Sequence, residues 1–241
     1  VILNGVPGVL VALVLLVFRG TRQLGGKNKP LQDGATRDGR VQSFGDYVRG
    51  LAPLFRNRAL ILLSTSSAFR SMTQNALLTF LPVYLAYEMD FSPVWVGASL
   101  FALQAAGFAA APVAGHLSDG MGRKTVMMTS MAMTAVVLLF MAFAGKSFAF
   151  VVLVAVLGFF LYAIRPVMQA WLLETTPKNM GGTSIGVLFG AQSLGSSLAP
   201  LLAGMIADRY GLGATFYFLA GTIIVANLFI FFMPHTGKDA A

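Results

Sequence analysis

Cysteine is absent from this 241-residue sequence, which also contains only two histidines and nine acidic residues. Without cysteine, disulfide bonds and thiolate metal sites are excluded. Two histidines and no cluster of carboxylates leave no recognisable metal site. Catalysis would need polar groups gathered in one place, and the sequence does not provide them. We therefore expect no enzyme, no metal and no cofactor.

Charge is the second shortage. Only 11% of the residues are charged and 56% are hydrophobic, whereas about 25% of an average soluble domain is charged. The apolar residues gather into long runs, most of which reach the ~20 residues that a helix needs to cross a bilayer. This pattern predicts an all-α polytopic membrane helix bundle. The seven runs are residues 1–18, 59–87, 94–115, 125–144, 148–171, 185–207 and 213–233.

The first run is short and begins at Val1 without an initiator methionine. A signal peptide would have a basic start and a cleavage site of small residues, and Val1–Phe18 has neither. We therefore expect this sequence to be a piece of a longer chain that begins within a helix.

Basic residues lie mainly on one side of the predicted membrane. If the runs cross alternately, thirteen of the seventeen basic residues fall on the side that holds loop 19–57 and the C-terminus. The positive-inside rule then makes that side cytoplasmic, which in a bacterium places the protein in the inner membrane. Nucleic acid is not expected as a partner, because a nucleic-acid reader needs a solvated basic face.

Residues 19–57 form the one long polar connection. Within it, Val41, Phe44, Val48, Leu51 and Phe55 recur at helical spacing. This spacing predicts a short amphipathic helix, which either lies on the cytoplasmic membrane surface or packs as a linker helix.

Arg70 lies alone near the middle of the 59–87 run. A guanidinium keeps its proton, so it cannot become neutral in the membrane. Even on the mildest scale, a central arginine costs ~2.5–3.5 kcal/mol. It is therefore expected to face a partner group or a water-filled cavity, which points to a transport pathway.

The turn between the third and fourth runs carries the most specific motif, Gly115-His116-Leu117-Ser118-Asp119-Gly120-Met121-Gly122-Arg123-Lys124. Gly120 and Gly122 can both take positive φ at low cost in a tight connection. Asp119 can pair with Arg123 and accept hydrogen bonds from a helix N-terminus. Such a cluster can hold a helix bundle in one state and release it in another.

This turn resembles the signature loop of the major facilitator superfamily, although Gly120 stands where that family usually has a basic residue. The resemblance implies a twelve-helix alternating-access transporter and covers its C-terminal six-helix half plus the last helix of the N-terminal half. The tripeptide Phe69-Arg70-Ser71 resembles sequences of the fosmidomycin-resistance-type branch of this family. The implied parts are 1–18 as the sixth helix, 19–57 as the central cytoplasmic loop with its interfacial helix, 58–234 as the C-terminal bundle, and 235–241 as the cytoplasmic tail.

The resemblance also implies a substrate cavity between the two halves. Arg70 and Gln74 share one helix face, as do Arg165 and Gln169. Two cations near one cavity suit an anionic substrate, but they equally suit ion pairs with carboxylates of the missing half. The full predicted sets are the cavity residues Arg70, Gln74, Asn75, Arg165, Gln169 and Gln192, the latch residues Gly115, Asp119, Gly122, Arg123 and Lys124, and the kink or packing residues Pro166, Gly195, Pro200 and Gly204.

The leading functional prediction is a multi-pass efflux antiporter for small drug-like or anionic compounds, with the proton as coupling ion. Every acid of this sequence lies in a loop or near the end of a run, so the proton-carrying acid is expected in the N-terminal half, the other partner. The alternatives are an uptake symporter for an organic anion and, from another class, a membrane receptor or scaffold that transports nothing.

Overall fold

The computed structural model describes residues 57–144, 148–176 and 180–233. The predictions for the first apolar run, the central loop with its interfacial helix, and the C-terminal tail lie outside these residues. The chain divides into two compact units at Gly45, and all the described residues belong to the second unit.

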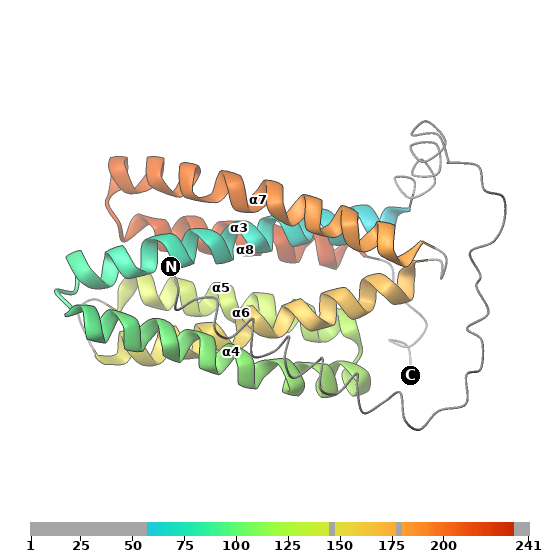
Figure 1. Cartoon of the computed structure of the whole chain (residues 1–241), viewed down its shortest axis with the longest axis horizontal. Coiled ribbons are helices and arrows are strands. Elements are labelled where there is room, and N and C mark those ends of the chain that lie inside the picture. Colours follow the sequence, from blue (N-terminus) through green and yellow to red (C-terminus); the bar gives the residue numbers. More distant parts are fainter. Residues whose placement is uncertain (1–56, 145–147, 177–179, 234–241) are drawn as a thin grey trace, which may run out of the picture. The chain divides into compact units, whose positions relative to one another are not determined.

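The described residues form an all-helical bundle, as the sequence predicts, and no strand occurs among them. The helices pack side by side along the bundle (Figure 1). They are α3 (Arg58–Tyr87), α4 (Pro93–Met121), α5 (Arg123–Phe143), α6 (Phe148–Thr175), α7 (Gly181–Tyr210) and α8 (Ala214–Phe231).

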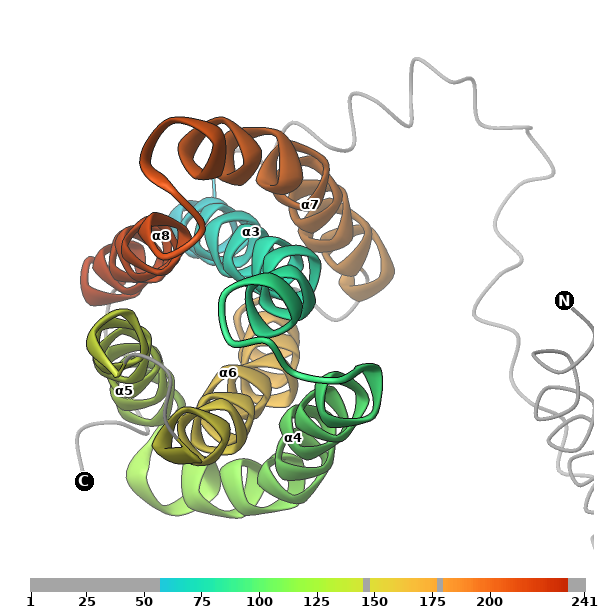
Figure 2. The same cartoon turned by 90° about the vertical axis from the view of Figure 1, so that its left-hand side faces the viewer.

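Pairwise contacts between helices build the bundle. α3 lies against α7 and α8, and α4 lies against α6. α5 packs against α6 and α8, which closes the ring seen end-on in Figure 2. An aromatic cluster of Tyr84, Phe150 and Phe216 fills part of the interior, with ring centroids 4.9–5.8 Å apart.

Five described helices, α4 to α8, are long and apolar enough to cross a membrane. α3 is 30 residues long but is not among them, although the sequence predicts a span there. The reason lies in its polar side chains, which face the other helices. Its buried polar residues are Ser64, Ser66, Ser67, Arg70, Ser71, Thr73 and Gln74.

The turn between α4 and α5 is tighter than the sequence predicts. α4 continues to Met121 and α5 begins at Arg123, so Gly122 alone separates them, with φ 86°. That positive φ favours glycine. The same expectation for Gly120 is wrong, because Gly120 lies within α4 and positive φ among the described glycines occurs at Gly122 and Gly211.

Candidate functional site

Arg70 is buried among the helices, with 1% of its surface exposed. Its Nη1 donates to Oε1 of Gln74 at 2.9 Å, one turn further along α3. Its Nε and Nη2 are also buried and have no hydrogen-bond partner among the described residues. Tyr162 and Arg165 of α6 are close enough to interact with its charge. The arginine that the sequence singles out is therefore packed inside the bundle and only partly satisfied.

A groove with a volume of about 770 Å³ runs between α4 and α6. It contains Arg165 and Gln169, two of the predicted cavity residues, together with Pro166. Arg165 is exposed there. The lining residues are Phe101, Gln104, Ala105, Gly107, Phe108, Ala111, Tyr162, Arg165, Pro166 and Gln169.

The remaining predicted cavity residues lie apart from this groove. Arg70, Gln74 and Gln192 are buried and do not line it. Asn75 contributes to the contact between α3 and α7, where its Nδ2 donates to Ser196 Oγ at 2.8 Å. The structure thus brings Arg165 and Gln169 together in one groove and places Arg70 and Gln74 within the helix packing.

The α4 side of the groove was not predicted, nor was Tyr162. Gln104 interrupts an apolar run, and such an isolated amide could have indicated a position that faces a polar site. The sequence could not assign Phe101 and Phe108 to the groove, because an aromatic residue in a membrane helix also suits a lipid-facing position. Tyr162 needs the fold to be recognised: its ring lines the groove, while its hydroxyl is buried without a partner among the described residues.

Two glycines allow direct contact between helix backbones. A Cβ at Gly195 of α7 would lie 2.1 Å from the carbonyl oxygen of Ala68 on α3, and one at Gly158 of α6 would lie 2.1 Å from that of Leu103 on α4. Gly195 was predicted as a packing residue and Gly158 was not. Gly204 is less restricted, since the nearest atom to its Cβ would be 3.7 Å away.

The predicted prolines lie inside continuous helices. Pro166 is within α6 and Pro200 within α7, and neither interrupts its helix. Pro166 lines the groove beside Arg165. Because proline cannot donate to the carbonyl one turn earlier, it leaves a local gap in the hydrogen bonding of α6 next to this site.

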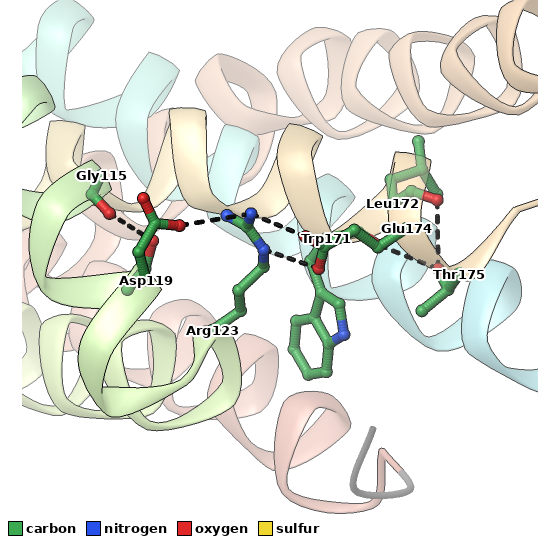
Figure 3. Close-up of polar contacts among 8 residues, drawn as sticks. Gly115, Asp119, Arg123, Trp171, Leu172, Glu174 and Thr175 are labelled. Atoms are coloured by element: carbon green, nitrogen blue, oxygen red, sulfur yellow. Dashed lines mark hydrogen bonds and ion pairs between the residues drawn. The ribbon is translucent and has the colours of Figure 1, made fainter. Parts of the chain in front are cut away.

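The signature turn joins three charged groups, shown in Figure 3. Arg123 Nη2 lies 3.6 Å from Asp119 Oδ1. The same guanidinium donates from Nε and Nη2 to the two carboxylate oxygens of Glu174, at 2.7 and 2.8 Å. The expected proximity of Asp119 and Arg123 is present, and the stronger partner, Glu174 at the end of α6, was missed. Sequence spacing gives no hint of a contact across 51 residues.

Lys124 behaves differently from its neighbour Arg123. It is 7% exposed, and its Nζ donates to the carbonyl oxygens of Phe231 at 3.0 Å and Met233 at 2.6 Å. These carbonyls belong to the end of α8, where a cation is favoured by the helix dipole. Gly115 accepts a hydrogen bond from Ser118 Oγ at 2.8 Å, so this end of α4 also has a local side-chain contact.

Curated relatives match about half of this chain. "Multidrug resistance protein MdtG" from Salmonella dublin is 33% identical over 126 residues, which are 52% of this chain and 31% of that protein. The protein of the same name from Serratia proteamaculans is 35% identical over 115 residues, 48% of this chain and 28% of that one. The aligned part therefore spans about a third of the length of these relatives.

Solved structures show the same fold at low sequence identity. A bacterial homologue of the human drug peptide transporters PepT1 and PepT2 aligns with TM-score 0.70 and 14% identity, over 76% of this chain and 45% of that one. The POT family transporter PepTSo aligns with TM-score 0.65 and 16% identity, over 76% and 40%.

The family resemblance carried by the signature turn is confirmed by a family-wide match. The sequence model described as Major Facilitator Superfamily matches residues 63–240, a stretch that includes the turn and most of every described helix. The narrower likeness to the fosmidomycin-resistance-type branch stays a prediction. With six described helices in the family's fold and most of its length matched, the chain belongs to the major facilitator superfamily.

Proposed function

We propose that the whole protein is a secondary active transporter, and no enzyme, that exports small drug-like or anionic compounds by alternating access. This chain supplies its C-terminal half, and residues 1–18 supply the last helix of the other half. The observation that carries the proposal is the groove between α4 and α6, into which Arg165 and Gln169 open. The name of the multidrug resistance relatives supports export as the direction.

The substrate cavity forms where this groove meets the N-terminal half. A volume of about 770 Å³ is within the 300–1,000 Å³ of sites for drug-sized ligands. Arg70 and Gln74 are buried on α3, while Asn75 and Gln192 belong to the α3–α7 side. Rocking of the two halves would expose the groove with Arg165 and Gln169 to each side of the membrane in turn, which is how transporters of this architecture move a solute past a fixed site.

The latch is the cluster of Asp119, Arg123 and Glu174. It ties the start of α5 to the end of α6 through the two hydrogen bonds of one guanidinium. Asp119 is the freer member, with 72% of its side chain exposed, so its carboxylate is available to a group of the N-terminal half. Closing and opening of that contact would bias the equilibrium between the two orientations of the cavity.

Proton coupling is part of the proposal. The described acids lie between helices or near helix ends: Glu88 and Asp90 follow α3, Asp119 is near the end of α4, Glu174 is near the end of α6, and Asp208 is near the end of α7. A titratable acid at mid-membrane depth would then be a residue of the N-terminal half. The proposed orientation in a bacterial inner membrane places loop 19–57 and the C-terminus in the cytoplasm, as the distribution of basic residues favours.

The test is flux of the full-length protein in proteoliposomes with an imposed proton gradient. Export of small aromatic drug-like compounds should require the gradient and collapse when a protonophore dissipates it. Arg70→Ala should reduce the rate, because it removes a buried cation near the site. If the protein instead accumulates an organic anion together with protons that move inward, the proposed export is wrong and the protein is an uptake symporter. A fully folded protein that moves none of these compounds would favour a receptor or scaffold.

A further inference from the structure

The groove between α4 and α6 combines aromatic and cationic side chains on two facing helix surfaces. On α4, Phe101, Gln104 and Phe108 are spaced by three and four residues, so they share one face. On α6, Tyr162 and Arg165 have the same spacing. The groove therefore offers flat apolar walls together with one guanidinium.

Tyr162 forms one wall of the groove. Its ring lines the groove and presses closely on α4, because a Cβ at Gly107 would lie 2.7 Å from that ring. Its hydroxyl is buried, has no hydrogen-bond partner among the described residues, and is near enough to Arg70 to interact with its charge. A larger residue at position 107 would displace the ring, so glycine sets the position of this wall.

The electrostatic character of the groove is cationic. Arg165 is exposed in it, and Arg70, buried on α3, is a second cation of the same bundle. Within the described part of the chain, the ion pairs of arginine are those of Arg123, so neither of these two arginines has an acidic partner. Two of the three guanidinium nitrogens of Arg70 have no hydrogen-bond partner among the residues that the structure describes. The potential in the groove should attract anions and repel cations.

We infer that this groove is a half-site for aromatic organic anions, and that it discriminates against cations of the same shape. The inference rests on the proposed transport function and names the substrate class for it. The flat body of the ligand packs against Phe108 and the Tyr162 ring, and its acid group faces Arg165. The amides of Gln104 and Gln169 donate to the remaining oxygens.

The absence of cysteine from this chain allows a direct test of charge preference. In the full-length protein, with any cysteine of the other half replaced, Ala105→Cys places one thiol in the groove and Val113→Cys places a control thiol at an exposed position of α4, two turns away and outside the groove lining. Each is reacted with an anionic and a cationic methanethiosulfonate reagent of matched size. Comparing the anion-to-cation rate ratio between the two positions cancels the intrinsic reactivities of the reagents.

The ratio should be higher in the groove than at the control position by on the order of tenfold. For an illustrative separation of ~7 Å, a unit charge changes the local concentration of a singly charged reagent about threefold in water and about fiftyfold at an effective dielectric constant of ~20. Arg165→Gln should lower the ratio severalfold, and Arg165→Lys should restore most of it, because lysine keeps the charge. Since Arg165 is exposed, both variants should fold.

Ligand protection supplies the second measurement. 2-Naphthoate should slow labelling at Ala105→Cys, whereas 2-naphthylmethylammonium at the same concentration should not. Equal rate ratios at the two positions, or equal protection by both compounds, would overturn the inference even if transport is normal. Conversely, loss of all transport with an intact charge preference would overturn the proposed function and leave the half-site standing.

Discussion

Replacing Gly195 by alanine should separate α3 from α7 and destabilise the protein. The new Cβ would lie 2.1 Å from the carbonyl oxygen of Ala68, whereas ordinary contacts begin near 3.4 Å. The obstacle is a backbone atom, which cannot rotate away as a flexible side chain can. The two helices must therefore move apart by roughly an ångström.

The magnitude follows from two opposing terms. Overpacking of a tight contact costs about 1–3 kcal/mol, and the separation also weakens the neighbouring hydrogen bonds of Ser196 to Ser71 at 2.7 Å and to Asn75 at 2.8 Å. Hydrogen bonds between membrane helices are worth ~0.6 kcal/mol each on average. Alanine regains ~1 kcal/mol of helix propensity. The net effect should be a loss of about 2 kcal/mol.

The matched control is Gly190→Ala on the same helix, where a Cβ meets no atom within 4 Å. That variant gains the helix propensity without the clash, so it should be neutral or slightly stabilising. Both proteins are purified in the same detergent and heated at the same scan rate, because unfolding of a membrane protein is commonly irreversible and its Tm depends on that rate. Gly195→Ala should unfold several degrees below the control. If it unfolds at the same temperature or above, the backbone contact does not limit the approach of these helices.

Three further predictions concern the signature turn. Asp119→Asn should abolish transport with little loss of expression, because an exposed carboxylate contributes little to stability; normal transport by this variant would contradict the latch. Arg123→Lys keeps the charge but cannot form both hydrogen bonds to Glu174, so transport should fall at least tenfold while Tm changes by no more than a degree or two. Lys124→Met should lower Tm by several degrees, because it leaves two helix-end carbonyls without their donor at ~1.5–3 kcal/mol per charged hydrogen bond; an unchanged Tm would show that water replaces the ammonium.

The bundle could be predicted from the sequence because its apolar runs are long and separated by short turns. α3 shows the limit of that reasoning. Its polar residues reduce its hydropathy, yet they mark it as an inner helix, since Arg70 and Gln74 are buried against their neighbours. The exact ends of helices could be predicted less well, because a helix can continue through Gly120 as readily as it can stop there.

The sequence could predict only those parts of the site in which the residues share one helix. Arg165 and Gln169 belong together because they are one turn apart, and the groove contains both. The contact of Arg123 with Glu174 depends on how α5 and α6 pack, and no local pattern encodes that. For the same reason the sequence could not show that the Lys124 ammonium donates to carbonyls at the end of α8, and its role in the latch stays a prediction. Pairings between distant segments are decided by tertiary packing, which only the fold provides.

Arg70 and Arg165 together constrain what the rest of the protein must contribute. Each lies in a closely packed helix pair, α3 with α7 at Gly195 and α4 with α6 at Gly158. Two like charges repel each other, and the repulsion grows where water is excluded. Arg165 is exposed and can turn toward water, but Arg70 is held by Gln74 and cannot. A buried and partly satisfied guanidinium is costly in a membrane helix, so further polar or charged partners, or water, are expected within its reach. Because the acids of the described helices lie near helix ends, we expect the groups that balance these two cations to be a carboxylate of the proposed N-terminal half or an anionic compound bound in the groove beside Arg165.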